Sequence, residues 1–129
     1  MRRLSPGGML FTFVPRIDHV AVETADPDAL AAFYERVFGA RVVKTEGHPV
    51  MAYVGGTAFA IHEVGGPGPH TAVRLTAEEL EQLKHDLDAA GIEWRERDHG
   101  IAVGVFFEDP DGRQLEAIWY RGADDPRRP

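Results

Sequence analysis

The chain has 129 residues, which is enough for one domain with a core of its own but too short for two independent domains. Its 21 acidic residues outnumber its 14 basic residues, and the formal net charge of −7 disfavours binding to the phosphate backbone of nucleic acid. Because the chain contains no cysteine, disulfides, thiolate metal sites and thiol nucleophiles are excluded. No apolar stretch approaches the length of a membrane span.

The two ends of the chain differ in composition from its middle. Residues 1–15 are expected to form a leader outside the fold, because their apolar run at residues 9–14 is too short for an export signal. We therefore expect a cytoplasmic protein. Residues 122–129 are polar and contain proline, so we expect a disordered tail. A single domain is expected over residues 16–121.

The first half of this domain predicts a strand, a helix and three further strands. Residues 17–24 are rich in β-branched side chains, which favour a strand. Asp26 and Pro27 then supply an N-cap and a proline at the first helical position, and Gly39 ends the helix. An apolar stripe along this helix consists of Leu30, Phe33, Tyr34, Val37 and Phe38. The three strands are expected at residues 41–45, 50–54 and 57–64.

The second half repeats this order after a linker. The glycine- and proline-rich residues 65–69 mark the linker. A strand is expected at residues 70–75, followed by a helix that begins with a capping box of Thr76 and Glu79. The last three strands are expected at residues 92–97, 101–108 and 113–120. The domain is thus predicted to contain two βαβββ modules, at residues 16–65 and 70–121.

The repeat also organises four polar residues on apolar strands. The pattern His-x-Ala-Val occurs at His19 and at His70, in the first strand of each module. The last strand of each module carries His62 or Glu116 at nearly the same spacing. Strand alternation places these side chains on the sheet face away from the helices, where a cation would relieve the cost of burying a carboxylate. Histidine and carboxylate together are donors for a divalent metal.

These residues give the chain a resemblance to the vicinal oxygen chelate superfamily. That superfamily includes glyoxalase I, methylmalonyl-CoA epimerase, fosfomycin-resistance transferases, extradiol ring-cleaving dioxygenases and the bleomycin-resistance proteins. The motifs that carry the resemblance are Ile17-Asp18-His19-Val20, Phe33-Tyr34 with Phe38-Gly39, and Phe107-Glu108-Asp109-Pro110-Asp111-Gly112 with Leu115-Glu116. The resemblance implies an α+β fold in which two βαβββ modules form a half-open barrel around a metal. It also implies that His19, His70 and Glu116 are metal ligands.

His62 falls where glyoxalase I and its relatives have a fourth ligand, usually Glu or Gln. Two interpretations stay open. His62 is either a fourth metal ligand, which the repeat favours because it occupies the place of Glu116 in the other module, or a base that moves a proton beside the metal. Either His62 or Glu116 could then take part directly in catalysis.

The remaining candidates concern the substrate. Arg74 shares the face of His70 and could bind an anionic group, although pairing with an acidic neighbour such as Glu23 is an equal alternative. Tyr53 and Phe106 could line the pocket, or could be core aromatics. The histidines expected on the solvated surface are His48, His85 and His99.

The implied chemistry is chelation of a small substrate through two adjacent oxygens by a divalent metal (Ni, Zn, Mn or Fe(II)) that acts as a Lewis acid. Four protein ligands favour a glyoxalase-like lyase or isomerase, which is our first expectation. Three ligands favour an Fe(II) ring-cleaving dioxygenase. The third alternative is a non-enzymatic drug-binding resistance protein, which has no need of a complete ligand set. We also expect a homodimer, and no nucleic-acid or membrane partner.

Overall fold

The computed structural model describes residues 15–129, so the expected leader lies outside the described residues apart from Pro15. The elements are β1 (Arg16–Thr24), α1 (Pro27–Phe38), β2 (Arg41–Val43), β3 (Val50–Val54), β4 (Thr57–Glu63), β5 (His70–Arg74), α2 (Ala77–Ala89), β6 (Trp94–Asp98), β7 (Ala102–Glu108) and β8 (Gln114–Tyr120). The predicted order βαβββ, repeated twice, is confirmed, and the strand ends differ from the prediction by at most two residues.

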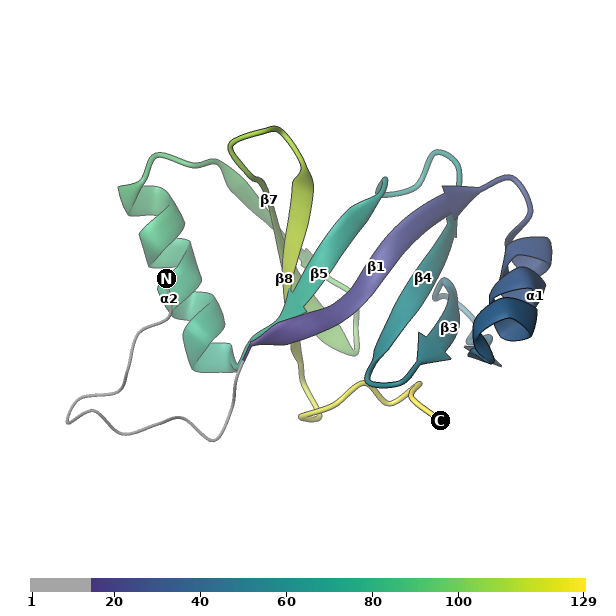
Figure 1. The fold of residues 1–129 in the computed structure, drawn as a ribbon. Coiled ribbons are helices and arrows are strands. Elements are labelled where there is room, and N and C mark those ends of the chain that lie inside the picture. The colour runs from purple at the N-terminus through teal and green to yellow at the C-terminus, as the bar shows by residue number, and fades with distance from the viewer. Residues whose placement is uncertain (1–14) are drawn as a thin grey trace.

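All eight strands belong to one sheet in the order β2-β3-β4-β1-β5-β8-β7-β6. The first strands of the two modules, β1 and β5, pair antiparallel at its centre. Each is flanked in parallel by the last strand of its own module, β4 or β8. The sheet does not close, since β2 and β6 are its two edges, and α1 and α2 lie at opposite ends of the structure (Figure 1). The α+β architecture of a half-open barrel is confirmed.

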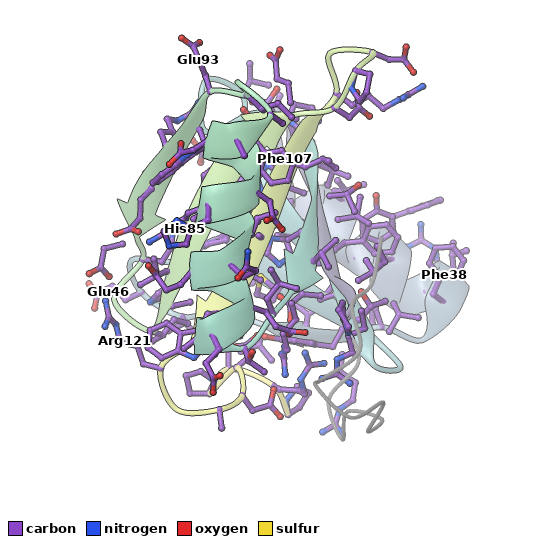
Figure 2. The ribbon with its side chains drawn as sticks, turned by 90° about the vertical axis from the view of Figure 1, so that its left-hand side faces the viewer. Phe38, Glu46, His85, Glu93, Phe107 and Arg121 are labelled. Carbon is purple, nitrogen blue, oxygen red and sulfur yellow. The ribbon has the colours of Figure 1, made fainter. Side chains whose placement is uncertain are left out.

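Helix α2 covers the second module, as the sequence predicts. Its capping box is present: the Glu79 amide donates to the Thr76 hydroxyl, and the Thr76 amide donates to the Glu79 carboxylate, both at 3.1 Å. Leu80 and Leu87 are buried against β7 and β8. His85 lies on the exposed side of this helix (Figure 2). Within residues 15–129, no helix is long and apolar enough to cross a membrane.

Helix α1 is less deeply packed than its apolar stripe predicts. It begins at the N-cap Asp26 and ends at Gly39, whose φ of 67° is the left-handed conformation expected there. Ala31 is its buried residue, and Tyr34 stacks on Phe59 of β4 with ring centroids 4.2 Å apart. The exposed members of the stripe are Phe33, Val37 and Phe38. The helix packs on the sheet through Ala31, Leu30 and Tyr34, so the stripe extends beyond the contact.

Strand β1 carries an irregularity that a simple alternation rule misses. Its register against β5 shifts between Ile17 and His19. As a result the neighbouring residues Asp18 and His19 are both buried, with exposures of 2% and 6%, whereas a regular strand would turn one of them to the opposite face. Asp18 therefore has a position in the site that regular strand alternation does not predict.

The tail at residues 122–129 packs on the domain, in contrast to the expected disorder. Asp125 is 4% exposed, and its carboxylate accepts a hydrogen bond from the Tyr53 hydroxyl at 2.6 Å. The same carboxylate pairs with Arg127 at 2.9 Å. The polar composition that suggested disorder instead supplies an ion pair within the tail and a hydrogen bond to Tyr53 of β3, a distant contact that local composition cannot predict.

Candidate metal centre

Three side chains from three adjacent strands converge on one point of the concave sheet face. His19 lies on β1, His70 on β5 and Glu116 on β8, and one donor atom of each lies within 4.8 Å of the others. The strand register explains the convergence, because Ala72 of β5 lies opposite both His19 and Glu116. All three side chains are buried. The residues that the sequence analysis assigned as ligands are therefore brought together.

The two imidazole rings are held in the orientation that metal binding requires. Nδ1 of His19 donates to a carboxylate oxygen of Asp18 at 2.8 Å, and Nδ1 of His70 donates to the carbonyl oxygen of Gly68 at 2.7 Å. The Nε2 atoms of His19 and His70 lie 3.4 Å and 3.2 Å from Oε1 of Glu116. With Nδ1 protonated, Nε2 carries the lone pair for a metal. Metal-binding histidines in proteins are oriented by this kind of second hydrogen bond.

The other carboxylate oxygen of Glu116 has its own partner. Oε2 accepts a hydrogen bond from Nε2 of His99 at 2.9 Å. Gly104 of β7 lies against the same oxygen so closely that a β-carbon there would overlap it. Burial alone would raise the pKa of Glu116, but hydrogen bonds from His19, His70 and His99 outweigh burial and hold the pKa well below its usual range. The ionised carboxylate thus directs Oε1 toward the two imidazoles.

Asp18 connects the site to the rest of the domain. Its carboxylate accepts hydrogen bonds from Arg74 at 2.8 Å and from the Tyr120 hydroxyl at 2.6 Å. Burial raises the pKa of Asp18, but hydrogen bonds from His19 and Tyr120 overcome burial and lower the pKa to about 2. Asp18 is therefore ionised at neutral pH and keeps its hydrogen bond to Nδ1 of His19.

The electrostatics favour a cation between the three donors. Burial lowers the pKa of His19, but hydrogen bonds to Asp18 and Glu116 outweigh burial and raise the pKa to about 9. Positive charge is thus stabilised between the imidazole and the carboxylate. Two Nε2 atoms and one carboxylate oxygen, with their neighbouring groups already oriented, fit a divalent metal that takes the place of that proton.

The three residues open onto a pocket of about 520 Å³, a size suited to a small molecule. Five of the six histidines of the chain line it, namely His19, His48, His62, His70 and His99. The surface position expected for His48 and His99 is therefore wrong, and only His85 lies away from the pocket. The signal that could have found His99 is Gly104, since a glycine within an apolar strand indicates a close approach by another group.

His62 lines the pocket but lies outside the set of three converging donor atoms. Its ring centroid is 6.3 Å from that of His70. Burial, together with the positive charges of His70 and His19, lowers the pKa of His62 to about 4. At neutral pH this imidazole is therefore uncharged.

Two of the three predicted substrate-binding residues lie elsewhere. Phe106 lines the pocket, with its ring edge-on to His70 at a centroid distance of 5.2 Å. Tyr53 is buried on β3, where its hydroxyl is occupied by Asp125. Neither Tyr53 nor Arg74 contributes to the pocket lining within the described part of the chain.

The guanidinium of Arg74 is occupied by ion pairs with two aspartates. Its guanidinium binds Asp18 and Asp124, each at 2.8 Å, and the side chain is almost fully buried. The alternative of pairing with an acidic neighbour is therefore the observed one, although the partners are Asp18 and Asp124 instead of Glu23. The irregularity in β1 is the physical reason, because it turns Asp18 inward beneath the end of β5.

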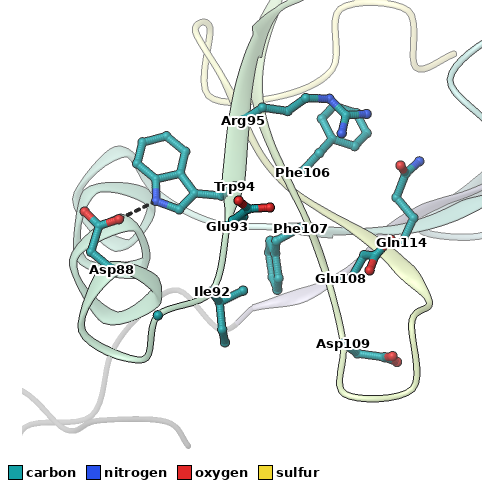
Figure 3. A pocket seen from close by; sticks show the side chains of 11 residues that line it. Asp88, Ile92, Glu93, Trp94, Arg95, Phe106, Phe107, Glu108, Asp109 and Gln114 are labelled. Carbon is teal, nitrogen blue, oxygen red and sulfur yellow. Dashed lines mark hydrogen bonds between the residues drawn. The ribbon is translucent and has the colours of Figure 1, made fainter.

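A larger and more open cleft of about 1130 Å³ lies on another part of the structure (Figure 3). It lies between the end of α2, strand β6 and the hairpin of β7 and β8. The Trp94 indole donates to Asp88 at its margin, at 2.8 Å (Figure 3). None of the three converging donors lines this cleft. The chemistry is therefore assigned to the smaller pocket.

Sequence comparison connects this geometry to known proteins. The profile of the Glyoxalase/Bleomycin resistance protein/Dioxygenase superfamily matches residues 16–117, a range that contains all three donors. The chain belongs to this superfamily. Proteins of the superfamily bind divalent metals and act on small molecules. The resemblance seen in the sequence motifs is thereby confirmed.

The superfamily member is similar to two curated proteins named metallothiol transferase FosB. It is 25% identical to that of Lysinibacillus sphaericus, with 80% of this chain and 81% of the relative covered. It is 30% identical to that of Bacillus licheniformis, with 78% of this chain and 72% of the relative covered.

Among solved structures, the 2,3-dioxygenase LapB from Pseudomonas sp. KL28 shares the fold, with a TM-score of 0.68 and 22% identity. The match covers 81% of this chain but 40% of that dioxygenase.

Proposed function

We propose that the chain is a metal-dependent enzyme that acts on a small substrate with adjacent oxygen atoms. The observation that carries this proposal is the convergence of Nε2 of His19 and Nε2 of His70 on Oε1 of Glu116, with both Nδ1 atoms already engaged. A divalent metal bound there, Ni, Zn, Mn or Fe(II), supplies Lewis acidity toward the substrate oxygens. A purely drug-binding protein has no use for this arrangement.

In this proposal His62 is the base. It lines the pocket outside the group of converging donors, where its imidazole can face the substrate without being a metal ligand. Glu116 serves as a ligand, because Oε1 faces the two imidazoles while Oε2 is bound by His99. Phe106 bounds the space in which the substrate lies.

The reaction that this arrangement supports is proton transfer in a chelated substrate, as in a glyoxalase-like lyase or isomerase. Two other reactions each have one supporting observation. Thiol transfer is supported by the two FosB relatives, both of which are named metallothiol transferases. Oxidative ring cleavage uses a set of two histidines and one carboxylate, which is the set formed here by His19, His70 and Glu116.

One experiment separates these reactions. The protein is loaded with each metal and supplied with small hydroxyketones, ketoaldehydes and catechols, with and without a thiol. Product is followed by NMR, oxygen with an electrode and free thiol with a colour reagent. Conversion of the hydroxyketones without thiol and with no loss of oxygen supports a lyase or isomerase. Loss of thiol with these hydroxyketones, beyond that in an enzyme-free control, indicates a transferase, and oxygen uptake indicates a dioxygenase.

Two variants test the assigned roles in the same assay. His62→Ala should lose turnover while it retains the metal, because His62 is proposed as the base. His85→Ala, which changes an exposed histidine on α2, should match the parent. Equal activity with and without metal would contradict the proposal, and failure of the protein to take up any of these metals would favour the drug-binding alternative.

We also infer that the protein forms a homodimer, since members of the superfamily commonly pair modules across a two-fold axis. Sedimentation at micromolar concentration should give twice the mass of one chain. A monomer at that concentration would contradict the inference.

A further inference from the structure

The pocket around the candidate metal centre contains arginine residues that the sequence analysis did not consider. Arg97 from β6 and Arg127 from the C-terminal tail both contribute to its lining. The acidic residues of the same lining are Asp98 and Glu116. The chain as a whole carries a formal charge of −7, so this pocket differs in charge from the rest of the molecule.

The acidic groups of the pocket already have partners. Glu116 is bound by three histidines. Asp98 is paired with Arg121 at 2.7 Å and accepts a hydrogen bond from the Gly100 amide. Neither carboxylate is therefore available to neutralise Arg97, which makes no ion pair within residues 15–129. With a divalent metal bound, the pocket would hold an excess of positive charge.

Arg127 is held in place with part of its guanidinium unused. Nε and Nη2 bind the buried carboxylate of Asp125 at 2.9 Å and 3.3 Å, and the Arg127 side chain is 9% exposed. Asp125 is fixed in turn by the Tyr53 hydroxyl. Nη1 of Arg127 makes no hydrogen bond to any residue that the structure describes. An oriented guanidinium with a free N–H group is a strong donor to an anionic oxygen.

We infer that the substrate of this site carries an anionic group, such as a phosphate, phosphonate or carboxylate, which is bound by Nη1 of Arg127 with Arg97 adding charge at the pocket rim. This inference rests on the proposed function and names the class of its substrate. Arg127, and not Arg74, is thus the arginine that binds the anionic group of the substrate. The tail is then part of the binding site, because Asp125 and Tyr53 fix the arginine that contacts the ligand.

The experiment measures binding of inorganic phosphate to the metal-free protein by calorimetry. Metal-free protein is used because a bound metal would itself attract phosphate. Arg127→Gln should weaken phosphate binding by about tenfold or more, since a charge-assisted hydrogen bond is lost. Arg127→Lys should bind with intermediate affinity, because the charge remains while the fixed geometry is lost. The matched control is Arg113→Gln, which changes an exposed arginine outside the pocket.

A second variant keeps the test decisive if the tail of Arg127→Gln detaches. Arg97 is exposed, so Arg97→Gln leaves the fold intact and should weaken phosphate binding several-fold. Phosphate affinity equal to the parent in both Arg127→Gln and Arg97→Gln would overturn the inference, as would failure of the parent to bind phosphate. Metal uptake is measured separately on the same variants and should not change. Failure of the protein to bind a metal would therefore be distinguishable from failure to bind phosphate.

Discussion

Nε2 of His99, which lies in the turn that joins β6 to β7, donates to Oε2 of Glu116 on β8 at 2.9 Å. The contact leaves Oε1 of Glu116 as the oxygen that faces His19 and His70. His99→Ala should therefore weaken metal affinity about tenfold to hundredfold without unfolding the protein, as is usual when a residue that orients a metal ligand is removed. Competition with a metal indicator measures this effect. His85→Ala is the control, and equal affinities in the two variants would contradict a role for His99.

Gly104 leaves the space that the Glu116 carboxylate occupies. A β-carbon at this position would overlap Oε2 of Glu116 and would lie 3.1 Å from Nε2 of His99. Gly104→Ala should lower the free energy of unfolding by about 1–3 kcal/mol and reduce metal affinity, because the buried carboxylate must move. Gly56→Ala is a matched control, since a β-carbon there meets no atom within 4 Å. Chemical denaturation measures both, and identical curves would contradict the packing argument.

Metal affinity should depend on pH through His19. The pKa of His19 is raised to about 9, so the ring keeps its proton through the neutral range and must lose that proton to bind a metal. Affinity should therefore rise about tenfold per pH unit between about pH 6.5 and pH 8. A competition titration at constant ionic strength tests the slope. A flat profile would contradict ligation by His19 and His70.

The tail should depend on Tyr53 for its attachment. Tyr53→Phe removes the hydroxyl that donates to Asp125 and leaves a buried carboxylate short of one hydrogen bond. The free energy of unfolding should fall by about 1–3 kcal/mol. Tyr34→Phe is the control, because the Tyr34 ring stacks on Phe59 and its hydroxyl makes no hydrogen bond within residues 15–129. Thermal unfolding distinguishes the two, and equal stability losses would contradict an anchored tail.

Local sequence signals predicted the fold well. The capping box of Thr76 and Glu79 and the helix stop at Gly39 each depend on neighbouring residues, and the two helices lie where these signals place them. The burial of α1 was overestimated, because an apolar stripe does not reveal how much of a helix contacts the sheet. Phe38 remains 56% exposed.

Strand periodicity predicts part of the site only. The convergence of His19, His70 and Glu116 follows from the repeat and from strand alternation. Asp18 was not predicted as part of the site, because an irregularity in β1 has no clear sequence signal. Arg127 was not predicted, because its partner Asp125 is fixed by a tyrosine 72 positions away. Contacts between segments far apart in the sequence cannot be predicted from local patterns.

Metal affinity of the parent and of four variants, measured by calorimetry, tests the central claim most directly. The parent should bind one divalent ion per chain. His70→Ala and Glu116→Gln should each lose most of that affinity with the fold intact, whereas His62→Ala and the control His85→Ala should bind as the parent does. Parent-like binding by both His70→Ala and Glu116→Gln would contradict the assignment of the metal centre.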